Sequence, residues 1–150
     1  MLSKRRSSYL GILLLVVVLV VVHVLTFSMP AWAANTTTVL YSFTGGTDGG
    51  DPASGLAFDG AGNIYRTTVV GGAFGFGTVF ELSPSANGWS QTVLHSFAGA
   101  PDGQYAYGGV TLDSAGNLYG TTVSGGTGSC GGGCGVVFQL TNSAGVGLRA

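Results

Sequence analysis

The stretch Gly109-Val-Thr-Leu-Asp-Ser-Ala-Gly-Asn-Leu-Tyr-Gly-Thr-Thr-Val-Ser-Gly-Gly126 decides the fold, because it repeats an earlier stretch of the same chain. Its counterpart is Gly55-Leu-Ala-Phe-Asp-Gly-Ala-Gly-Asn-Ile-Tyr-Arg-Thr-Thr-Val-Val-Gly-Gly72, which lies 54 residues earlier and is identical at 11 of 18 positions. At the same shift, Thr38-Val-Leu-Tyr-Ser-Phe43 returns as Thr92-Val-Leu-His-Ser-Phe97. The chain therefore contains a tandem repeat, and the repeat is the first guide to its fold.

Each repeat unit predicts about four short strands. The segments 55–58, 64–69, 77–82 and 92–97 alternate in polarity and are rich in β-forming residues. Between the first two strands of each unit, Asp59-Gly-Ala-Gly-Asn63 and Asp113-Ser-Ala-Gly-Asn117 predict a hairpin turn. Asp59 and Asp113 would accept a turn amide, and Gly62 and Gly116 would supply the positive φ. We therefore predict an all-β fold of tandem four-stranded units of about 54 residues, similar to propeller blades.

The array is predicted to be incomplete. The sequence supplies a lone strand at 38–43, a full unit at 55–97, a partial unit at 109–140 and a tail, 141–150, that ends where another strand is due. Blades bury their faces only against neighbours, so three or more units are normally needed. The repeat count favours a truncated copy of a longer array. Alternatively, the lone strand completes the last blade, in the same chain or in a partner chain.

Residues 1–33 have the layout of a secretory signal peptide. Basic residues at 4–6 precede the apolar run Leu10 to Phe27, and the small-residue pattern Ala31-Trp32-Ala33 follows. We predict cleavage after Ala33, with retention as an N-terminal anchor as the alternative. In both cases the remainder is exported, to the cell envelope or the medium, and contacts a membrane only through an uncleaved leader.

Charge argues against a nucleic-acid partner. Only Arg66 and Arg149 are cationic after residue 33, against six acidic residues, so that this part carries a formal charge of 2 − 6 = −4. A nucleic-acid interface needs clustered Lys and Arg side chains. The partner is predicted instead to be the chain itself, or a glycan or protein of the cell envelope.

The repeat motifs resemble the GloVer (Gloeo_Verruco) tandem-repeat family of exported bacterial surface proteins with varied sorting anchors. The resemblance covers Thr38 to Leu140 and rests on the repeated stretch, on Gly77-Thr-Val-Phe-Glu-Leu82 and on the Val-Leu-x-Ser-Phe strand. It implies export and a multi-blade array, and it implies no established catalytic activity. Two features depart from the pattern: Arg66, where the second unit has Gly120, and a four-residue insertion around Cys130.

Cys130 and Cys134 are the only cysteines, and they flank three glycines in the inserted loop. In an exported protein this spacing favours a local disulfide, with free thiols or an intermolecular link as alternatives. A zinc site is disfavoured because neither a histidine nor a further cysteine lies nearby in the sequence.

No cofactor is predicted, although calcium is an alternative. Asp59, Asn63, Asp113 and Asn117 place oxygen ligands on glycine-rich turns, as calcium loops do. The same residues are what hairpin turns require, and the full calcium-loop spacing is missing.

The sequence favours a non-enzymatic protein. His95, the sole histidine after the leader, is Tyr41 in the repeat, and a strand position that accepts either ring suits packing or the surface better than a general base. Glu81 is Gln139 in the other unit, so a pair of catalytic carboxylates would have to come from unrelated aspartates. We predict an exported or cell-surface β-repeat protein with a binding or structural role. One alternative is a fragment of a propeller-type hydrolase or lyase with calcium in its central channel. Another is a glycan-binding module that uses the loop aromatics Phe74, Phe76, Trp89, Tyr105 and Tyr107.

Overall fold

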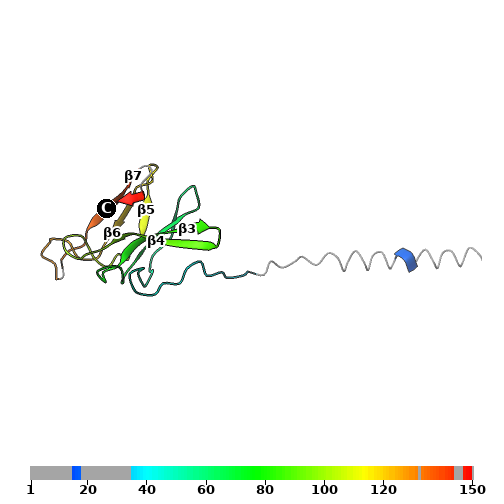
Figure 1. Cartoon of the computed structure of the whole chain (residues 1–150), viewed down its shortest axis with the longest axis horizontal. Helices are drawn as coiled ribbons and strands as arrows, with labels where there is room; N and C mark the ends of the chain where they lie inside the picture. Colours follow the sequence, from blue (N-terminus) through cyan, green and yellow to red (C-terminus); the bar gives the residue numbers. More distant parts are fainter. Residues whose placement is uncertain (1–14, 18–34, 132, 144–146, 150) are drawn as a thin grey trace, which may run out of the picture. The chain divides into compact units, whose positions relative to one another are not determined.

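The computed structural model describes residues 15–17, 35–131, 133–143 and 147–149 (Figure 1). The chain divides into Met1–Thr38 and Val39–Ala150. Apart from a helical segment at 15–17, every regular element of the described residues is a strand. The predicted all-β fold of tandem four-stranded units is thereby confirmed.

The first sheet corresponds to the full repeat unit. It consists of β1 (Ala57–Phe58), β2 (Ile64–Thr68), β3 (Thr78–Ser85) and β4 (Gly88–Ser96) in the order β1-β2-β3-β4. Every neighbouring pair is antiparallel. Short turns connect the strands, so that each strand pairs with the one that follows it in the chain.

The second sheet repeats the first in topology and, over its first three strands, in register. It consists of β5 (Val110–Leu112), β6 (Leu118–Thr121), β7 (Val137–Ser143) and β8 (Gly147–Arg149), in the order β5-β6-β7-β8. Pairing follows the repeat: Tyr65 lies opposite Glu81 in the first sheet, as Tyr119 lies opposite Gln139 in the second. The sequence repeat is therefore also a repeat of strand pairing.

Two predicted boundaries are wrong. Residues 38–43, expected to be a lone strand, form no strand, because no other described strand lies beside them to pair with their backbone. The tail after Leu140, expected to be a truncated end, continues β7 to Ser143 and returns as β8, which pairs with Thr141–Ser143. The second unit therefore has a short fourth strand, while residues 144–146 lie outside the described part.

The main hydrophobic core lies between the two sheets. Tyr65 and Val79 of the first sheet pack with Leu118 and Leu140 of the second, and all four are buried. The connection between the sheets adds Phe97 and Ala106, which are buried as well. Figure 1 shows the two sheets as neighbouring blades, and this core holds them together.

A second core covers the opposite face of the first sheet. Ile64, Phe80 and Leu82 are buried there, and Tyr41, Phe43 and Trp89 pack against them. The segment at 38–43 thus contributes side chains to the fold without pairing its backbone. The ring centroids of Phe43 and Phe80 are 4.9 Å apart.

Aromatic packing also follows the repeat. Phe97 corresponds to Phe43, and its ring centroid lies 5.2 Å from that of Phe138, the counterpart of Phe80. Gly120 makes room for this ring, because a Cβ there would lie 2.5 Å from Cζ of Phe138. Arg66 occupies the corresponding position of the first sheet.

The backbone repeats in one feature that the side chains do not predict. Asp51 and Tyr105, which are 54 residues apart, are the non-glycine residues with positive φ among the described residues, at 52° and 59°. Side chains other than glycine, Asn and Asp seldom adopt this left-handed conformation. Both units therefore place a residue other than glycine in the left-handed conformation at the same repeat position, an Asp in the first unit and a Tyr in the second.

The predicted leader falls largely outside the described residues, and so does the predicted cleavage site at Ala33. In the part of the chain that the structure describes, no helix is long and apolar enough to cross a membrane.

Candidate functional site

The Asp59 turn is closed by a carboxylate that accepts four hydrogen bonds. The backbone amides of Ala61 and Asn63 donate at 2.9 Å each. The Asn63 side-chain amide donates at 2.8 Å and the Tyr65 hydroxyl at 3.0 Å. Gly62 adopts the positive φ, 85°, that the turn requires.

The Asp113 turn has the same hydrogen bonds. Ala115 and Asn117 donate backbone amides at 2.9 Å, the Asn117 side chain donates at 2.7 Å, and the Tyr119 hydroxyl donates at 3.1 Å. Gly116 has a φ of 81°. Strand β6 follows directly, so the turn also sets where the sheet begins.

These hydrogen bonds shift the acidity of the turn residues. Burial acts to raise the pKa of Asp59, but the donors on Asn63, Tyr65 and Ala61 together outweigh it and bring the pKa below 3.8. Hydrogen bonds from Asn117 lower the pKa of Asp113 in the same direction. For Tyr65, burial and then the Asp59 carboxylate raise the pKa to about 12.

The predicted calcium candidates are thus engaged with the protein itself. A carboxylate offers about four acceptor positions, and each of these two receives four donors. The Asn63 and Asn117 side chains point their donor nitrogens at the carboxylates. Within the described residues, no three His, Cys, Asp or Glu side chains group closely enough to hold a metal ion.

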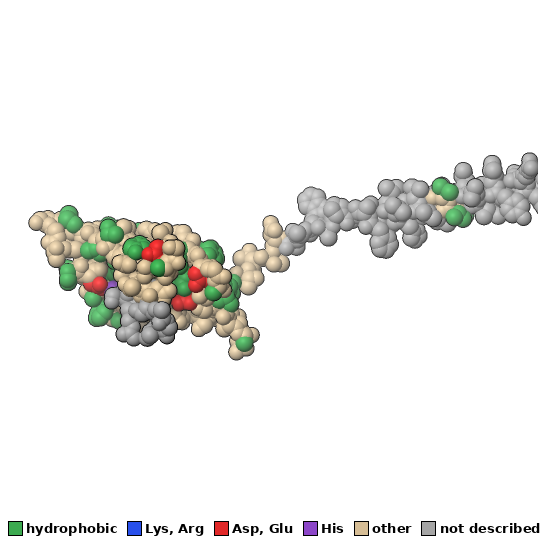
Figure 2. Space-filling view, turned by 90° about the horizontal axis from the view of Figure 1, so that it is seen from above, with side chains coloured by type: hydrophobic (Ala, Val, Ile, Leu, Met, Phe, Trp, Pro, Cys, Tyr) green, Lys and Arg blue, Asp and Glu red, His purple; other side chains and the backbone are tan. Residues whose placement is uncertain are grey.

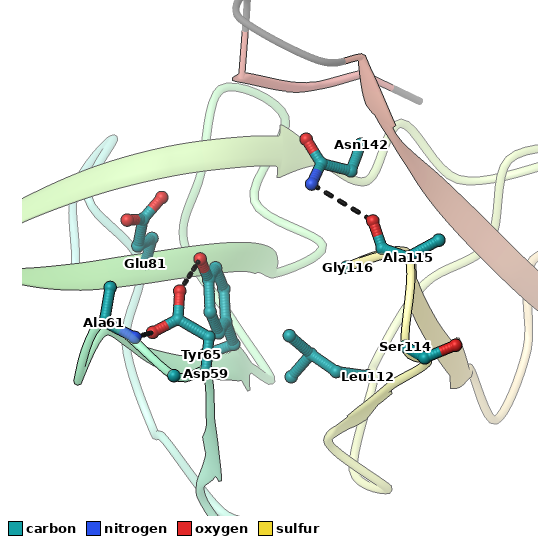
Figure 3. Close-up of a pocket in the computed structure, with 10 residues that line it drawn as sticks. Asp59, Ala61, Tyr65, Glu81, Leu112, Ser114, Ala115, Gly116 and Asn142 are labelled. Atoms are coloured by element: carbon teal, nitrogen blue, oxygen red, sulfur yellow. Dashed lines mark hydrogen bonds between the residues drawn. The ribbon is translucent and has the colours of Figure 1, made fainter.

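A cleft of about 360 Å³ lies between the two turns, at the junction of the sheets (Figure 3). Residues of the first unit form one side of it and residues of the second unit form the other, as Figure 3 shows. Its lining consists of Asp59, Gly60, Ala61, Tyr65, Glu81, Leu112, Ser114, Ala115, Gly116 and Asn142. Sequence reasoning missed this cleft, because it forms only where consecutive units pack.

The lining combines acidic, polar and apolar groups. The Glu81 carboxylate is half-buried, and the Ser83 hydroxyl donates to its Oε1 at 2.6 Å. On the other side, the Asn142 side-chain amide donates to the Ala115 carbonyl oxygen at 3.3 Å. Leu112 adds apolar surface between the two sides. The cleft can therefore accept hydrogen bonds from hydroxyl or amino groups while covering an apolar edge.

The charge around the cleft is acidic. In the face of Val39–Ala150 that Figure 2 shows, Asp and Glu side chains appear at several points and neither Lys nor Arg is in view. Of the residues that line the cleft, Asp59 and Glu81 are acidic and none is Lys or Arg. Such a field favours neutral or cationic ligands over anionic ones.

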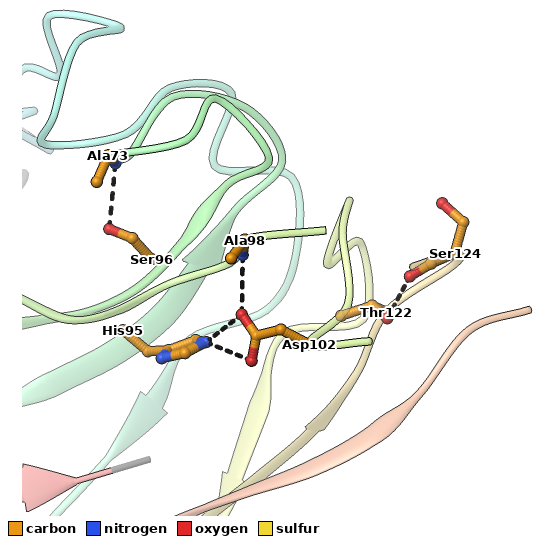
Figure 4. A network of polar contacts seen from close by, with 7 residues as sticks. All are labelled: Ala73, His95, Ser96, Ala98, Asp102, Thr122 and Ser124. Atoms are coloured by element: carbon orange, nitrogen blue, oxygen red, sulfur yellow. Dashed lines mark hydrogen bonds and ion pairs between the residues drawn. The ribbon is translucent and has the colours of Figure 1, made fainter. Parts of the chain in front are cut away.

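His95 has a carboxylate partner that the sequence did not reveal. Its Nε2 lies 2.9 Å from Oδ2 of Asp102, as Figure 4 shows. The same Asp102 oxygen accepts the backbone amide of Ala98 at 2.8 Å. Both side chains are partly exposed, at 19% for His95 and 35% for Asp102.

The corresponding pair in the first unit is Tyr41 and Asp48. The Tyr41 hydroxyl donates to Asp48 at 3.1 Å, and the backbone amide of Thr44 donates to the same oxygen at 2.8 Å. Phenol and imidazole thus fill one structural position, and in each unit the ring binds the nearby carboxylate. The carboxylate in each unit closes the loop that precedes it, 44–48 in the first unit and 98–102 in the second.

Most of the predicted loop aromatics are packed. Phe76 and Tyr105 contact each other edge to face, with centroids 6.1 Å apart, and Trp89 packs against the second core. Phe74 and Tyr107 remain exposed, at 59% and 55%. They lie on separate loops, so the five residues do not form one aromatic surface.

Cys130 and Cys134 are joined in a disulfide, with Cα atoms 4.9 Å apart. The backbone amide of Gly133 donates to the Cys130 carbonyl oxygen at 2.8 Å, and that of Gly126 donates to Cys134 at 2.5 Å. The disulfide therefore closes the inserted loop against the preceding Gly-Gly turn. It is compatible with an extracytoplasmic location.

Comparison with known proteins identifies the family. The sequence model of the Gloeobacter/Verrucomicrobia repeat matches residues 23–148, so the chain belongs to that repeat family, as its motifs predicted. Neither the curated proteins nor the solved structures contain a significant match.

Proposed function

We propose that this member of the Gloeobacter/Verrucomicrobia repeat family is an exported, non-enzymatic surface protein that binds a neutral or amino-bearing glycan between its two units. The observation that carries the proposal is the cleft at the sheet junction, with Glu81 and Asp59 on one side and Asn142 on the other. Its volume of about 360 Å³ is within the usual range of small-molecule sites, roughly 300–1,000 Å³.

The chemistry of the lining suits a sugar. Hydroxyl or amino groups can donate to the Glu81 carboxylate, while the half-buried Leu112 offers apolar surface to the C–H face of a sugar ring. The cleft is built where one unit meets the next, so every added unit of a longer array would add one such cleft. Repetition of weak sites is an effective route to avidity on a polymeric ligand.

The non-enzymatic role is supported by how the candidate catalytic groups are used. Asp59 is held by four donors that lower its pKa, which is the wrong direction for a proton donor. His95 occupies a position that Tyr41 fills in the other unit. Export is supported by the leader pattern of residues 1–33 and by the Cys130–Cys134 disulfide.

Titration with a panel of oligosaccharides tests the proposal. The panel holds neutral glucose oligomers, N-acetylglucosamine oligomers, glucosamine oligomers and, as the anionic member, uronic acid oligomers. We expect calorimetric binding of a neutral or amino member. Loss of a charge-assisted hydrogen bond, about 1.5–3 kcal/mol, predicts that Glu81→Gln weakens binding by roughly tenfold or more.

The repeat supplies a matched control. Gln139 is the counterpart of Glu81 and lies outside the cleft lining. Gln139→Glu therefore makes the reverse exchange at the corresponding place, and we expect it to leave binding unchanged. Equal effects of the two exchanges, or no binding by any member of the panel, would refute the cleft as the glycan site.

A further inference from the structure

The outward face of the second sheet exposes positions that the first sheet buries. We call this surface the trailing face; it is formed by Tyr119, Thr121, Val123 and Val137. Val137 is 81% exposed, whereas its counterpart Val79 is fully buried at 0%. The same contrast holds for the other members, whose counterparts Tyr65, Thr67 and Val69 are all buried.

The opposite side of the molecule shows the complementary contrast. Leu56 and Phe58 are 50% and 61% exposed and form what we call the leading face. Their counterparts in the second unit, Val110 and Leu112, pack against the core between the two sheets. The outer faces of the two described sheets thus each expose one half of the contact that joins the units within the chain.

The contact within the chain shows how these halves fit. Strand β5, which carries Val110 and Leu112, lies beside β1 and β2 of the first sheet. The buried Thr67 hydroxyl donates across the junction to the Ala106 carbonyl oxygen at 2.7 Å. The corresponding groups at the two ends are the exposed Thr121 hydroxyl and the Pro52 carbonyl.

Exposed apolar side chains are concentrated on these two faces. Among the described residues of Val39–Ala150, nine large hydrophobic side chains are exposed, and five of them belong to the leading or trailing face. The other four are Val39, Leu40, Phe74 and Tyr107. Clustered apolar exposure of this kind marks a contact surface more than scattered single residues do.

We propose that the trailing face of one copy binds the leading face of a second copy, repeating between chains the contact that joins the two units within a chain. The partner surfaces differ, so the association is head-to-tail, and each dimer retains one free face of each kind. Tyr65 and Leu112, which lie at the junction within the chain, also line the glycan cleft. Cross-linking between chains needs no glycan, so failure of this proposal is distinguishable from failure of the proposed ligand.

Arg66 is the residue at which the leading face differs from the corresponding surface of the junction within the chain. At the junction within the chain this position is Gly120, whereas the Arg66 guanidinium donates to the Pro52 carbonyl oxygen. A carbonyl oxygen has two acceptor lone pairs, so it can also accept the Thr121 hydroxyl of a second copy. We expect Arg66→Gly, which restores the residue of the internal junction, to strengthen association.

Cysteine cross-linking of the full chain in bacterial cells tests the arrangement. Within the chain, β1, which carries Ala57, contacts β5, which carries Leu112. The counterparts of these two residues on the free faces are Thr111 and Phe58. Thr111→Cys therefore places a thiol beside the trailing face, and Phe58→Cys places one on the leading face. Differently tagged chains carrying one substitution each are co-expressed and treated with a short bismaleimide. We expect a covalent dimer that contains both tags, and none from either variant alone.

Two controls decide between the outcomes. Phe74→Cys places a thiol on an exposed side chain away from both faces and measures chance collision. A Thr111→Cys homodimer as abundant as the mixed dimer would show that two trailing faces meet, and would overturn the head-to-tail arrangement. The cross-linking is carried out with and without the additional substitution Arg66→Gly. If the mixed dimer is no more abundant than the dimer of the Phe74→Cys sample in either case, self-association through these faces is overturned.

Discussion

Nε2 of His95 lies 2.9 Å from Asp102, in the repeat position where the Tyr41 hydroxyl binds Asp48. In both units the carboxylate also accepts a backbone amide at 2.8 Å. The acid is therefore the constant part of the contact, and its ring partner is exchangeable. A structural role of this kind predicts which substitutions the position tolerates.

Replacement of His95 by Tyr should leave stability nearly unchanged, because Tyr41 shows that a phenol hydroxyl reaches the carboxylate in this loop. His95→Ala should lower the free energy of unfolding by about 1–2 kcal/mol, since it removes a partly exposed contact to a charged group. Urea unfolding at neutral pH measures both. Equal losses for the two variants would contradict the exchange of ring partners.

Gly120→Ala should destabilise the second sheet. The added Cβ would lie 2.5 Å from Cζ of Phe138 and 2.7 Å from the Gly109 carbonyl oxygen. Overpacking of this kind costs about 1–3 kcal/mol. Arg66→Ala at the corresponding position is the control, and we expect thermal melting to show a clearly larger drop in Tm for Gly120→Ala.

The protein should lose stability in acid through its turns. The pKa values of Asp48, Asp59 and Asp113 are lower in the folded state than the ordinary 3.8. Such groups contribute their full stabilisation when the pH is above 3.8. This contribution is lost as the pH falls below 3.8 and passes through the pKa that the group has in the folded state. Urea midpoints measured from neutral pH downward should fall steeply in that window.

Asp59→Asn provides the comparison for the acid transition. The amide cannot titrate, so the variant should be less stable at neutral pH and should lose less stability on acidification. An unchanged acid dependence would show that the turn carboxylate is not the titrating group. Repeating the melts with calcium and with a chelator also tests the calcium alternative, which predicts a calcium-dependent Tm that Asp59→Asn abolishes.

Reduction of the Cys130–Cys134 disulfide should have a small effect. The two residues are only four apart in sequence, so the closed loop is short. The chain-entropy relation gives about 2 kcal/mol for a loop of this size. Calorimetric melting with and without reductant measures the difference, and the double variant Cys130→Ser/Cys134→Ser should show no response to reductant.

The sequence predicted those parts of the fold that depend on local pattern. Asp59 and Asn63 frame a turn with recognisable chemistry, and the alternation in 64–69 predicts the strand that follows. Strand boundaries such as β8 were missed because a glycine-rich tail with a three-residue strand carries too little periodicity. The segment 38–43 was misassigned because a strand needs a partner, which sequence similarity to 92–97 does not supply.

The candidate site depended on contacts that no local pattern encodes. Glu81 and Asn142 line the same cleft although 61 residues separate them, and only the packing of two sheets brings them together. Asp102 was equally hard to assign to His95, because Pro101-Asp102-Gly103 indicates a turn but does not indicate which side chain the aspartate contacts. Alignment of the two units was the available signal, since it pairs Tyr41 with His95 and Asp48 with Asp102.

Asp51 and Tyr105 share a left-handed backbone although an acid and a phenol have little in common. When a unit of this kind is duplicated, the daughter inherits the path of its main chain, while the side chains along that path are free to drift. The side chains of a loop can then change, and with them what the loop binds, while its backbone conformation is kept. The common origin of two units can accordingly show in the path of the main chain at positions where the residue identities have diverged.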